Sequence, residues 1–473
     1  MPQSPRRVLS VFSLVMINII AVDNLRSLPI SAQYGFSLVF FYLVSALVFF
    51  IPSALVSAEL ATGWPNTGGV YIWVREAFGK RWGFLVIWLQ WIYNVVWYPT
   101  ILAFLAGIIA YLIPYYPHLA DSKIYMLAVI LSVFWLATIV NIFGMKASSF
   151  MSTVGTLVGT IVPMLLIAGL GIAWFVTKKT VQIKFSWVNF LPDVTHYNNL
   201  AFLTGVLFGL MGMEMSAVHA EEVINPQRDY PRALLYSTII ILGSLILASL
   251  AIAIVVPHAQ ISLVTGLIQA FGVFFKEFHM TVLLPVIGIA IVIGTLGSIS
   301  AWVIGPTKGL LVASHDGSLP PFFQKVNRAG VPVTLLFTQA IIVTILSGVF
   351  LLMPTVNSSY WLLSVLTSQL ALIFYIVLFA AAVKLRYVKP NQRRDFTIPG
   401  GKGGIWLVSG IGILACLAVI SFGFFPPPNM QIGSVYFYEA FLVLGIITFS
   451  LIPFVIYWLR KPKWISEEVG CRE

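Results

Sequence analysis

The chain has 473 residues, of which 59% are hydrophobic and only 9% carry a charge. A soluble domain has roughly 25% charged residues, so a soluble protein of this size could not hide so much apolar surface from water. The net charge of +11 comes from basic residues in short stretches between apolar runs, which argues against nucleic acid as a partner and favours membrane lipid. The two cysteines, Cys416 and Cys471, imply no disulfide framework.

Twelve apolar runs are long enough to cross a bilayer, which takes roughly 20 residues. They lie near 8–32, 36–61, 82–113, 123–143, 147–177, 198–222, 232–256, 281–314, 332–353, 358–387, 405–425 and 434–460. Arg6 and Arg7 precede the first run and no small-residue cleavage site follows it, so we expect a retained span rather than a signal peptide.

The basic residues predict an orientation. Twelve spans place both termini on one side, and Arg6 and Arg7 assign that side to the cytoplasm. With this choice 21 of the 27 Lys and Arg residues are cytoplasmic, and Arg26 lies inside a span. The remaining five are outside: Lys123, Lys178, Lys179, Lys184 and Lys276. This asymmetry predicts a multi-pass protein of the bacterial inner membrane with both termini cytoplasmic.

Two long connections indicate an internal repeat. One runs from Gly63 to Gly79 after the second span, and the other from Pro257 to His279 after the seventh. Five spans separate them, so they face opposite sides of the membrane, as an inverted five-helix repeat requires. Coincidence among eleven loops is the alternative.

The first helix of each half is interrupted. The stretch Val22–Ile30 contains polar residues and Pro29, which lacks an N–H and clashes with the carbonyl of Leu25. The sixth span contains Gly205, Gly209 and Gly212, and each glycine costs a helix about 1 kcal/mol. Interrupted helices at matching positions are typical of a transporter's central site, although glycines in spans also serve close packing.

Asp23, Arg26 and Glu214 are charged residues inside these spans, where a charge is expensive and usually has a function or a partner. Asp23 and Arg26 either pair with each other or leave Arg26 to bind a carboxylate of the substrate or of an outer gate. Freed N–H groups between Asn24 and Ser27 would add to such an anion site. Glu214 is a candidate proton-responsive group. The alternative is a protonated Glu214 that only bonds a neighbouring helix.

Other polar and aromatic residues are weaker candidates. Glu59, His219, Glu221 and Glu222 lie near cytoplasmic span ends, where a solvated interfacial role is expected rather than a metal site. Five residues could line a cavity: Trp97, Tyr98, Pro99, Trp302 and Tyr375. We find no catalytic or phosphate-binding motif, so we expect no enzyme activity and no cofactor, and transport driven by gradients.

Several stretches resemble the amino acid–polyamine–organocation transporters, most closely the bacterial glutamate/GABA antiporters. They are GFSLVFFYL from Gly35, AELATGWPNTGGVYIWVREAFGKRWGF from Ala58, MGMEMSAVHAEEVINPQRDYP from Met211, SAWVIGPTKG from Ser300, GVPVTL from Gly330 and IPGGKG from Ile398. They cover almost the whole chain in family order, and the sixth-span stretch and IPGGKG are specific.

The resemblance implies an all-α integral membrane protein with the inverted 5+5 repeat of a bacterial leucine transporter. The chain would be one transporter domain, 1–473, with repeats at 8–178 and 198–388 and two added helices at 405–460. Amino acid substrates would bind at the two helix breaks. The resemblance places Glu214 at the helix-6 glutamate that looks like the family's proton-responsive acid. It places Trp302 and Tyr375 at aromatic positions associated with the substrate pathway.

Three departures from the family pattern leave the substrate open. VDNLRSLP replaces the glycine-rich break of the arginine/agmatine branch and resembles a sodium-coupled relative's stretch in which the Arg belongs to the outer gate. Ser298 stands where the glutamate/GABA antiporter has a Glu, and the long C-terminal plug is missing.

The sequence therefore predicts a pH-sensitive amino acid antiporter, with Glu214 for proton coupling. The expected substrate-binding residues are Asp23, Asn24, Leu25, Arg26, Ser27, Tyr98, Met211, Gly212, Trp302 and Tyr375. A proton-coupled symporter and a transporter-like membrane sensor stay open as alternatives, as do the amino acid carried, the stoichiometry and the oligomeric state.

Overall fold

The computed structural model describes residues 9–64, 68–113, 117–143, 155, 157–192, 195, 197–215, 223–428 and 430–464, which form helices and no strand. The α-helices are α1 (Val11–Val22), α2 (Leu28–Ala32), α3 (Leu38–Ser45), α4 (Ile51–Gly63), α5 (Gly69–Phe78), α6 (Lys80–Leu112), α7 (Lys123–Ile142), α9 (Val162–Val176), α10 (Trp187–Phe190), α11 (Leu203–Gly209), α12 (Pro226–Val255), α13 (Gly266–Glu277), α14 (Leu283–His315), α15 (Val333–Ser347), α16 (Val349–Leu352), α17 (Val356–Val388), α18 (Gly401–Phe422) and α19 (Val435–Trp458). Short 3₁₀ and π segments connect several of them, including η1 (Leu25–Ser27), η3 (Ala46–Phe50) and η5 (Leu157–Ile161).

Within this described part, ten helical segments are long and apolar enough to cross a membrane, and α1 with α2 adds an eleventh, bent one. The sixth predicted span, 198–222, begins with α11 and continues into residues outside the described ranges. The prediction of an all-helical, multi-pass membrane protein is confirmed.

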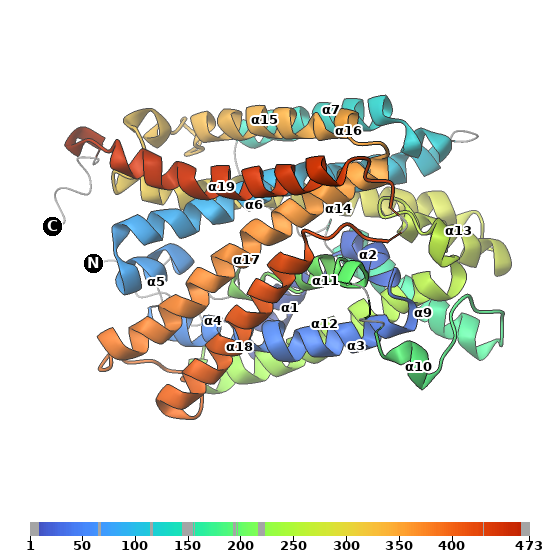
Figure 1. Ribbon diagram of the computed structural model, residues 1–473, viewed down its shortest axis with the longest axis horizontal. Coiled ribbons are helices and arrows are strands. Elements are labelled where there is room, and N and C mark those ends of the chain that lie inside the picture. Colours follow the sequence, from blue (N-terminus) through green and yellow to red (C-terminus); the bar gives the residue numbers. More distant parts are fainter. Residues whose placement is uncertain are drawn as a thin grey trace.

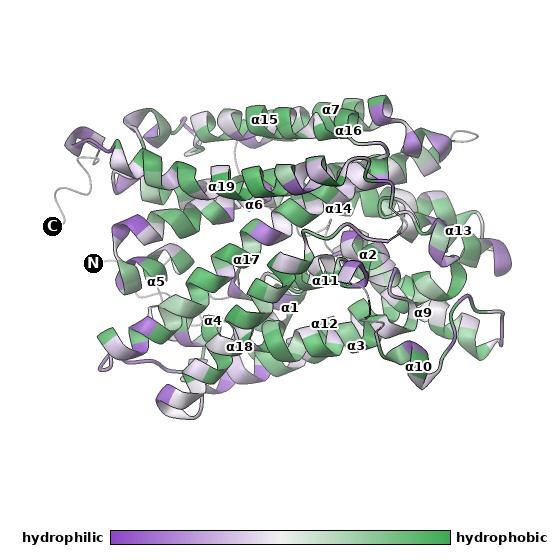
Figure 2. Cartoon of the chain, in the orientation of Figure 1, coloured by the Kyte–Doolittle hydropathy of each residue, from purple (hydrophilic) through white to green (hydrophobic). Residues whose placement is uncertain are grey.

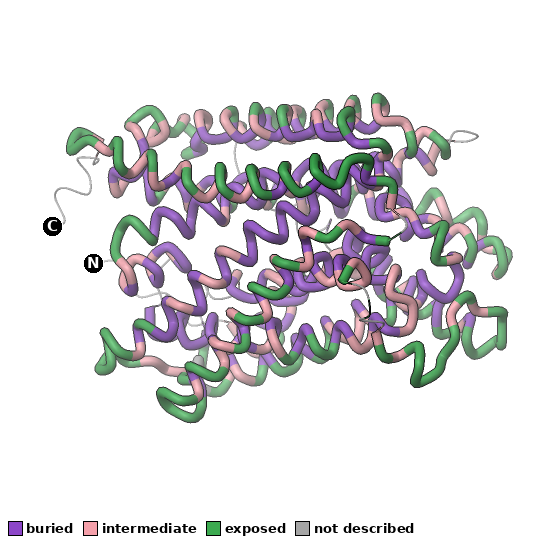
Figure 3. Tube along the Cα trace, viewed as in Figure 1, coloured by how far each residue is buried: buried purple, intermediate pink, exposed green. Residues whose placement is uncertain are grey.

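Helices α6 and α17 form the centre of the bundle. In their most apolar windows 83% and 89% of the residues are buried, whereas only 11% are buried in α19 (Figure 3). The exposed side chains of outer helices such as α7, α15 and α19 are mainly hydrophobic (Figure 2). Such a surface is stable in contact with lipid chains, which replace water as the solvent.

Both long connections of the sequence contain a helix. Helix α5 follows the second span and packs on α6 and α17, and α13 follows the seventh span and packs on α12 and α14. The two helices lie at opposite ends of the bundle, with the C-terminal end of α19 on the α5 side (Figure 1). This placement agrees with inverted repeats at 8–178 and 198–388, which remain a prediction.

The first span breaks after Val22, where the chain bends by 44° between α1 and the segment Leu25–Ala32. The side chain of Asn24 bridges the break, because its Nδ2 donates to the Val22 carbonyl at 3.1 Å and its Oδ1 accepts from the Ser27 N–H at 3.0 Å. Pro29 lies at the start of α2, where its missing N–H costs nothing. The break therefore lies at Asp23–Asn24, within the predicted stretch but before the proline.

The sixth span breaks where α11 ends at Gly209. Gly212 has a φ of +121°, a conformation that only glycine adopts without strain. A Cβ on Gly212 would lie 2.9 Å from the Ala21 carbonyl oxygen, and one on Gly209 would lie 3.1 Å from Ser27 Oγ. The two breaks therefore pack closely against each other.

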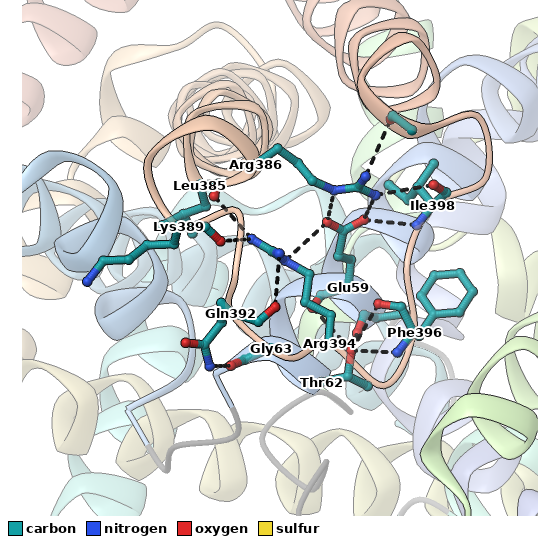
Figure 4. A network of polar contacts seen from close by, with 12 residues as sticks. Glu59, Thr62, Gly63, Leu385, Arg386, Lys389, Gln392, Arg394, Phe396 and Ile398 are labelled. Atoms are coloured by element: carbon teal, nitrogen blue, oxygen red, sulfur yellow. Dashed lines mark hydrogen bonds and ion pairs between the residues drawn. The ribbon is translucent and has the colours of Figure 1, made fainter.

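Glu59 joins α4 to the end of α17 and to the loop before α18 (Figure 4). Its side chain binds the Arg386 guanidinium through both oxygens, with Nη2 to Oε2 at 2.6 Å. Oε2 also accepts the Ile398 N–H at 2.9 Å, and Arg394 Nε lies 3.5 Å from Oε1. Burial lowers the pKa of Arg394 and the charge of Glu59 opposes this shift.

The expectation of a solvated Glu59 was wrong. The residue is only 1% exposed. Its ion-pair and hydrogen-bond partners come from a segment more than 300 residues later in the chain, which the sequence near Glu59 does not reveal.

Candidate functional site

A cavity lies between the two helix breaks and the central helices; we call it the central cavity. It encloses about 940 Å³, part of it open to solvent. Its lining includes seven of the predicted substrate-binding residues: Asp23, Asn24, Leu25, Arg26, Met211, Gly212 and Trp302. The other walls come from α6, η5 and α14, through residues such as Asn94, Thr160 and Ser298.

Arg26 is a buried cation that neutral groups hold in place. Its Nη1 donates to Thr100 Oγ1 at 3.0 Å, to Ser364 Oγ at 3.3 Å and to the Tyr360 hydroxyl at 3.4 Å. The guanidinium also lies 5.1 Å from the centre of the Phe208 ring.

No carboxylate of a described residue comes within 4 Å of Arg26, although the side chain is only 3% exposed and lines the central cavity. The guanidinium has five N–H groups, and Nη1 makes all of its hydrogen bonds to described residues. Its remaining donors can bind an anion.

Asp23 does not pair with Arg26. Its two carboxylate oxygens accept from Ser244 Oγ of α12, at 3.0 and 3.2 Å. The structure therefore contains no self-satisfied Asp23–Arg26 pair, and the central cavity presents an acid and a base as separate groups. One N–H that we expected to be free, that of Ser27, is bonded to Asn24 instead.

The aromatic candidates differ in position. Trp302 lines the central cavity and meets Trp97 edge-on, with ring centres 6.2 Å apart. Tyr98 does not line this cavity; its hydroxyl donates to the Trp302 carbonyl at 2.7 Å and fixes that part of α14. Ser27 also lies behind the wall, packed against Gly209.

Tyr375 connects α17 to the second break. Its hydroxyl accepts the Gly212 N–H at 2.9 Å and donates to Glu214 Oε2 at 2.5 Å. Gly212 faces the central cavity, whereas Glu214, only 3% exposed, lines a second cavity toward the α5 end. Glu214 thus lines the second cavity, two residues after the glycine that lines the central one.

Sequence reasoning missed the residues that hold Arg26. Tyr360 and Ser364 are four residues apart on α17, so they lie on one face of that helix. A polar i, i+4 pair in a span was the available signal. Because Tyr375 of the same helix bonds the second break, α17 contacts both breaks.

Some candidates cannot be placed. His219, Glu221 and Glu222 lie outside the described residues, as does Cys471. Across the described ranges, His, Cys, Asp and Glu side chains form no group of three that could hold a metal ion.

Comparisons with known proteins agree with these features. A family model described as amino acid permease matches residues 7–449. An uncharacterized transporter of Legionella pneumophila is 54% identical over 98% of this chain and 99% of its own length. A glutamate/gamma-aminobutyrate antiporter of Lactococcus lactis subsp. lactis is 30% identical over 96% and 91%. A probable agmatine/putrescine antiporter of the same organism is 23% identical over 83% of both chains.

Proposed function

Since the chain belongs to the amino acid permease family of the amino acid–polyamine–organocation superfamily, we propose that it exchanges amino acids across the membrane by alternating access. The first substrate pair to consider is glutamate and GABA, because two relatives that are 30% and 31% identical to the chain are named for that exchange. The substrate would bind in the central cavity between the two breaks.

The observation that carries this proposal is the burial of the Arg26 guanidinium among neutral hydrogen-bond partners. Among the described residues, the buried guanidinium contacts neutral hydroxyls and two aromatic rings and no carboxylate, so a carboxylate in the central cavity would offset its charge. Asp23, on the same cavity wall, can accept hydrogen bonds from the substrate's ammonium group. The aromatic side chains of Trp97 and Trp302 would cover its apolar part.

Exchange is tested with purified protein in liposomes loaded with each of about twenty amino acids. We expect uptake of labelled L-glutamate to require a loaded amino acid, with glutamate or GABA among the effective ones. Uptake into empty liposomes driven by a proton gradient alone would identify the symporter instead. Binding to the purified protein without flux would identify a sensor.

We also propose that the α5 end faces the cytoplasm of a bacterial cell, with both chain termini on that side. The 21-to-5 division of Lys and Arg residues supports this orientation. A reporter enzyme that is active only in the cytoplasm should be active when fused after Glu473. Activity restricted to a periplasmic reporter at the same position would refute the orientation.

Glu214 would couple exchange to pH. It lines the second cavity next to the second break and hydrogen-bonds Tyr375, so movement of the breaks would change its exposure to water. Glu214→Gln keeps the shape and fixes a neutral group, so we expect exchange with a flattened pH profile. Glu214→Asp should shift the profile. One carboxyl can change a rate up to about tenfold per pH unit, which liposome exchange from pH 4.5 to 8 resolves.

The matched control is Glu76→Gln, which changes a partly exposed acid at the α5 end that lies 3.6 Å from Lys389 Nζ. This variant should keep the wild-type profile. If Glu214→Gln also keeps it, Glu214 is a structural residue and the proton-responsive group lies elsewhere, with Asp23 next in line.

A further inference from the structure

The second cavity extends from Glu214 toward the α5 end; we call it the inner cavity. It encloses about 790 Å³, part of it open to solvent. Its walls come from the start of α5, from α6 and from the second half of α14, through Gly68, Gly69, Val70, Tyr71, Ile87, Gln90, Gly305, Pro306, Lys308, Gly309 and Val312. Because Gly212 lines the central cavity and Glu214 the inner one, the two cavities adjoin at the second helix break.

Lys308 is the basic group in the wall of the inner cavity. It is half-buried on α14, and no hydrogen bond or ion pair with another described residue satisfies its ammonium group. Two other cations at this end have partners: Arg75 lies 3.1 Å from Asp316, and Lys384 lies 4.4 Å from the centre of the Phe78 ring. Among the described residues, Lys308 therefore lines the inner cavity without an anionic partner.

Glu214 and Lys308 place a carboxyl group and an ammonium group in the wall of this cavity, with opposite charges when both are ionised, and they do not form an ion pair with each other. An α-amino acid carries the same two charges, an ammonium and a carboxylate, attached to one carbon. Lys308 can bind the carboxylate as a point charge, and Glu214 or the amide of Gln90 can accept the ammonium.

The wall of this cavity has open space at Gly305. A Cβ built on Gly305 meets no atom within 4 Å, whereas one on Gly309 would lie 2.7 Å from Ile87. Helices α14 and α6 are therefore in close contact at Gly309, and the wall next to Lys308 has room at Gly305.

We propose that the inner cavity is a second, transient binding site for the substrate on its way to or from the cytoplasm, with Lys308 as the anchor for a carboxylate. The inference rests on the proposed function, since it assigns a step of the same pathway. It adds a residue that acts on one side only: the central cavity serves both directions, whereas Lys308 serves the cytoplasmic opening.

The test is a comparison of apparent KM on the two sides, in oriented proteoliposomes with labelled L-glutamate as the probe. Lys308→Gln should raise the cytoplasmic KM about tenfold, the effect of losing one charge-assisted hydrogen bond, and leave the external KM unchanged. Lys308→Arg should retain most of the wild-type affinity. The control Lys384→Gln removes a cation at the same end and should change neither value.

A second readout does not depend on transport. The thiol introduced by Gly305→Cys, combined with Cys471→Ser, should react with a membrane-impermeant maleimide in inside-out vesicles, and L-glutamate should slow this reaction. The protection should disappear when Lys308→Gln is added. Cys416 is fully buried and should not interfere.

The inference fails if Lys308→Gln changes both KM values equally or neither, or if L-glutamate protects the introduced thiol equally without Lys308. Absence of exchange in the wild-type protein would refute the proposed function instead. In that case the protection experiment still decides whether the inner cavity binds the amino acid.

Discussion

Replacing Arg26 by alanine should lower the affinity for the amino acid substrate about a hundredfold and leave the protein folded. Truncating one partner of a buried, hydrogen-bonded charge pair costs several kcal/mol, and each 1.4 kcal/mol corresponds to a factor of ten in affinity. In the free protein the same change removes an uncompensated buried charge, and the hydroxyls of Thr100 and Ser364 can still donate to carbonyls of their own helices.

Two further variants separate charge from geometry. Arg26→Lys keeps the charge and loses the planar fork, so part of the affinity should return. Arg81→Ala removes an exposed arginine that lies over the Phe454 ring and should leave binding unchanged. Binding of labelled L-glutamate to purified protein measures all three. Wild-type affinity in Arg26→Ala would mean that Arg26 only links the first span to α6 and α17.

Replacing Glu59 by alanine should have the largest effect on stability, a loss of about 3–5 kcal/mol in the free energy of unfolding. The change leaves two guanidinium groups, those of Arg386 and Arg394, without their anion in a largely buried place (Figure 4). It also removes the acceptor of the Ile398 N–H. The link from α4 to the end of α17 would be lost.

The matched control for this prediction is Glu76→Ala. Glu76 is an acid near the same end of the bundle, but it is partly exposed and lies 3.6 Å from Lys389, so its loss should cost about 0–1 kcal/mol. Thermal unfolding of the two detergent-solubilised variants compares them directly. Equal melting temperatures would show that the Glu59 network contributes no more than a surface ion pair.

The sequence was informative where a local rule determined the structure. Gly212 marked the second break because a left-handed φ requires glycine, and the polar stretch around Asp23 marked the first. The predicted position of the first break within that stretch was less accurate. Pro29 suits the start of a helix as well as a break, and the hydrogen bonds of the Asn24 side chain place the break before the proline.

Contacts between distant segments could not be read from the sequence. Nothing near Glu59 indicates that Arg386 and Arg394 return to it, and a carboxylate at a span end is more often solvated. Likewise, the residues that hold Arg26 lie on α6 and α17, and only the packing of these helices against the first break brings them together. The inner cavity depends on the same kind of packing, between α5, α6 and α14.

The most direct test of the proposed site is a structure of the protein determined with saturating L-glutamate. We expect density for the amino acid in the central cavity, with a carboxylate within hydrogen-bond distance of the Arg26 guanidinium and between the breaks at Asp23–Asn24 and Gly209–Gly212. Substrate density elsewhere in the protein, with Arg26 still bonded only to Thr100, Tyr360 and Ser364, would contradict the assignment.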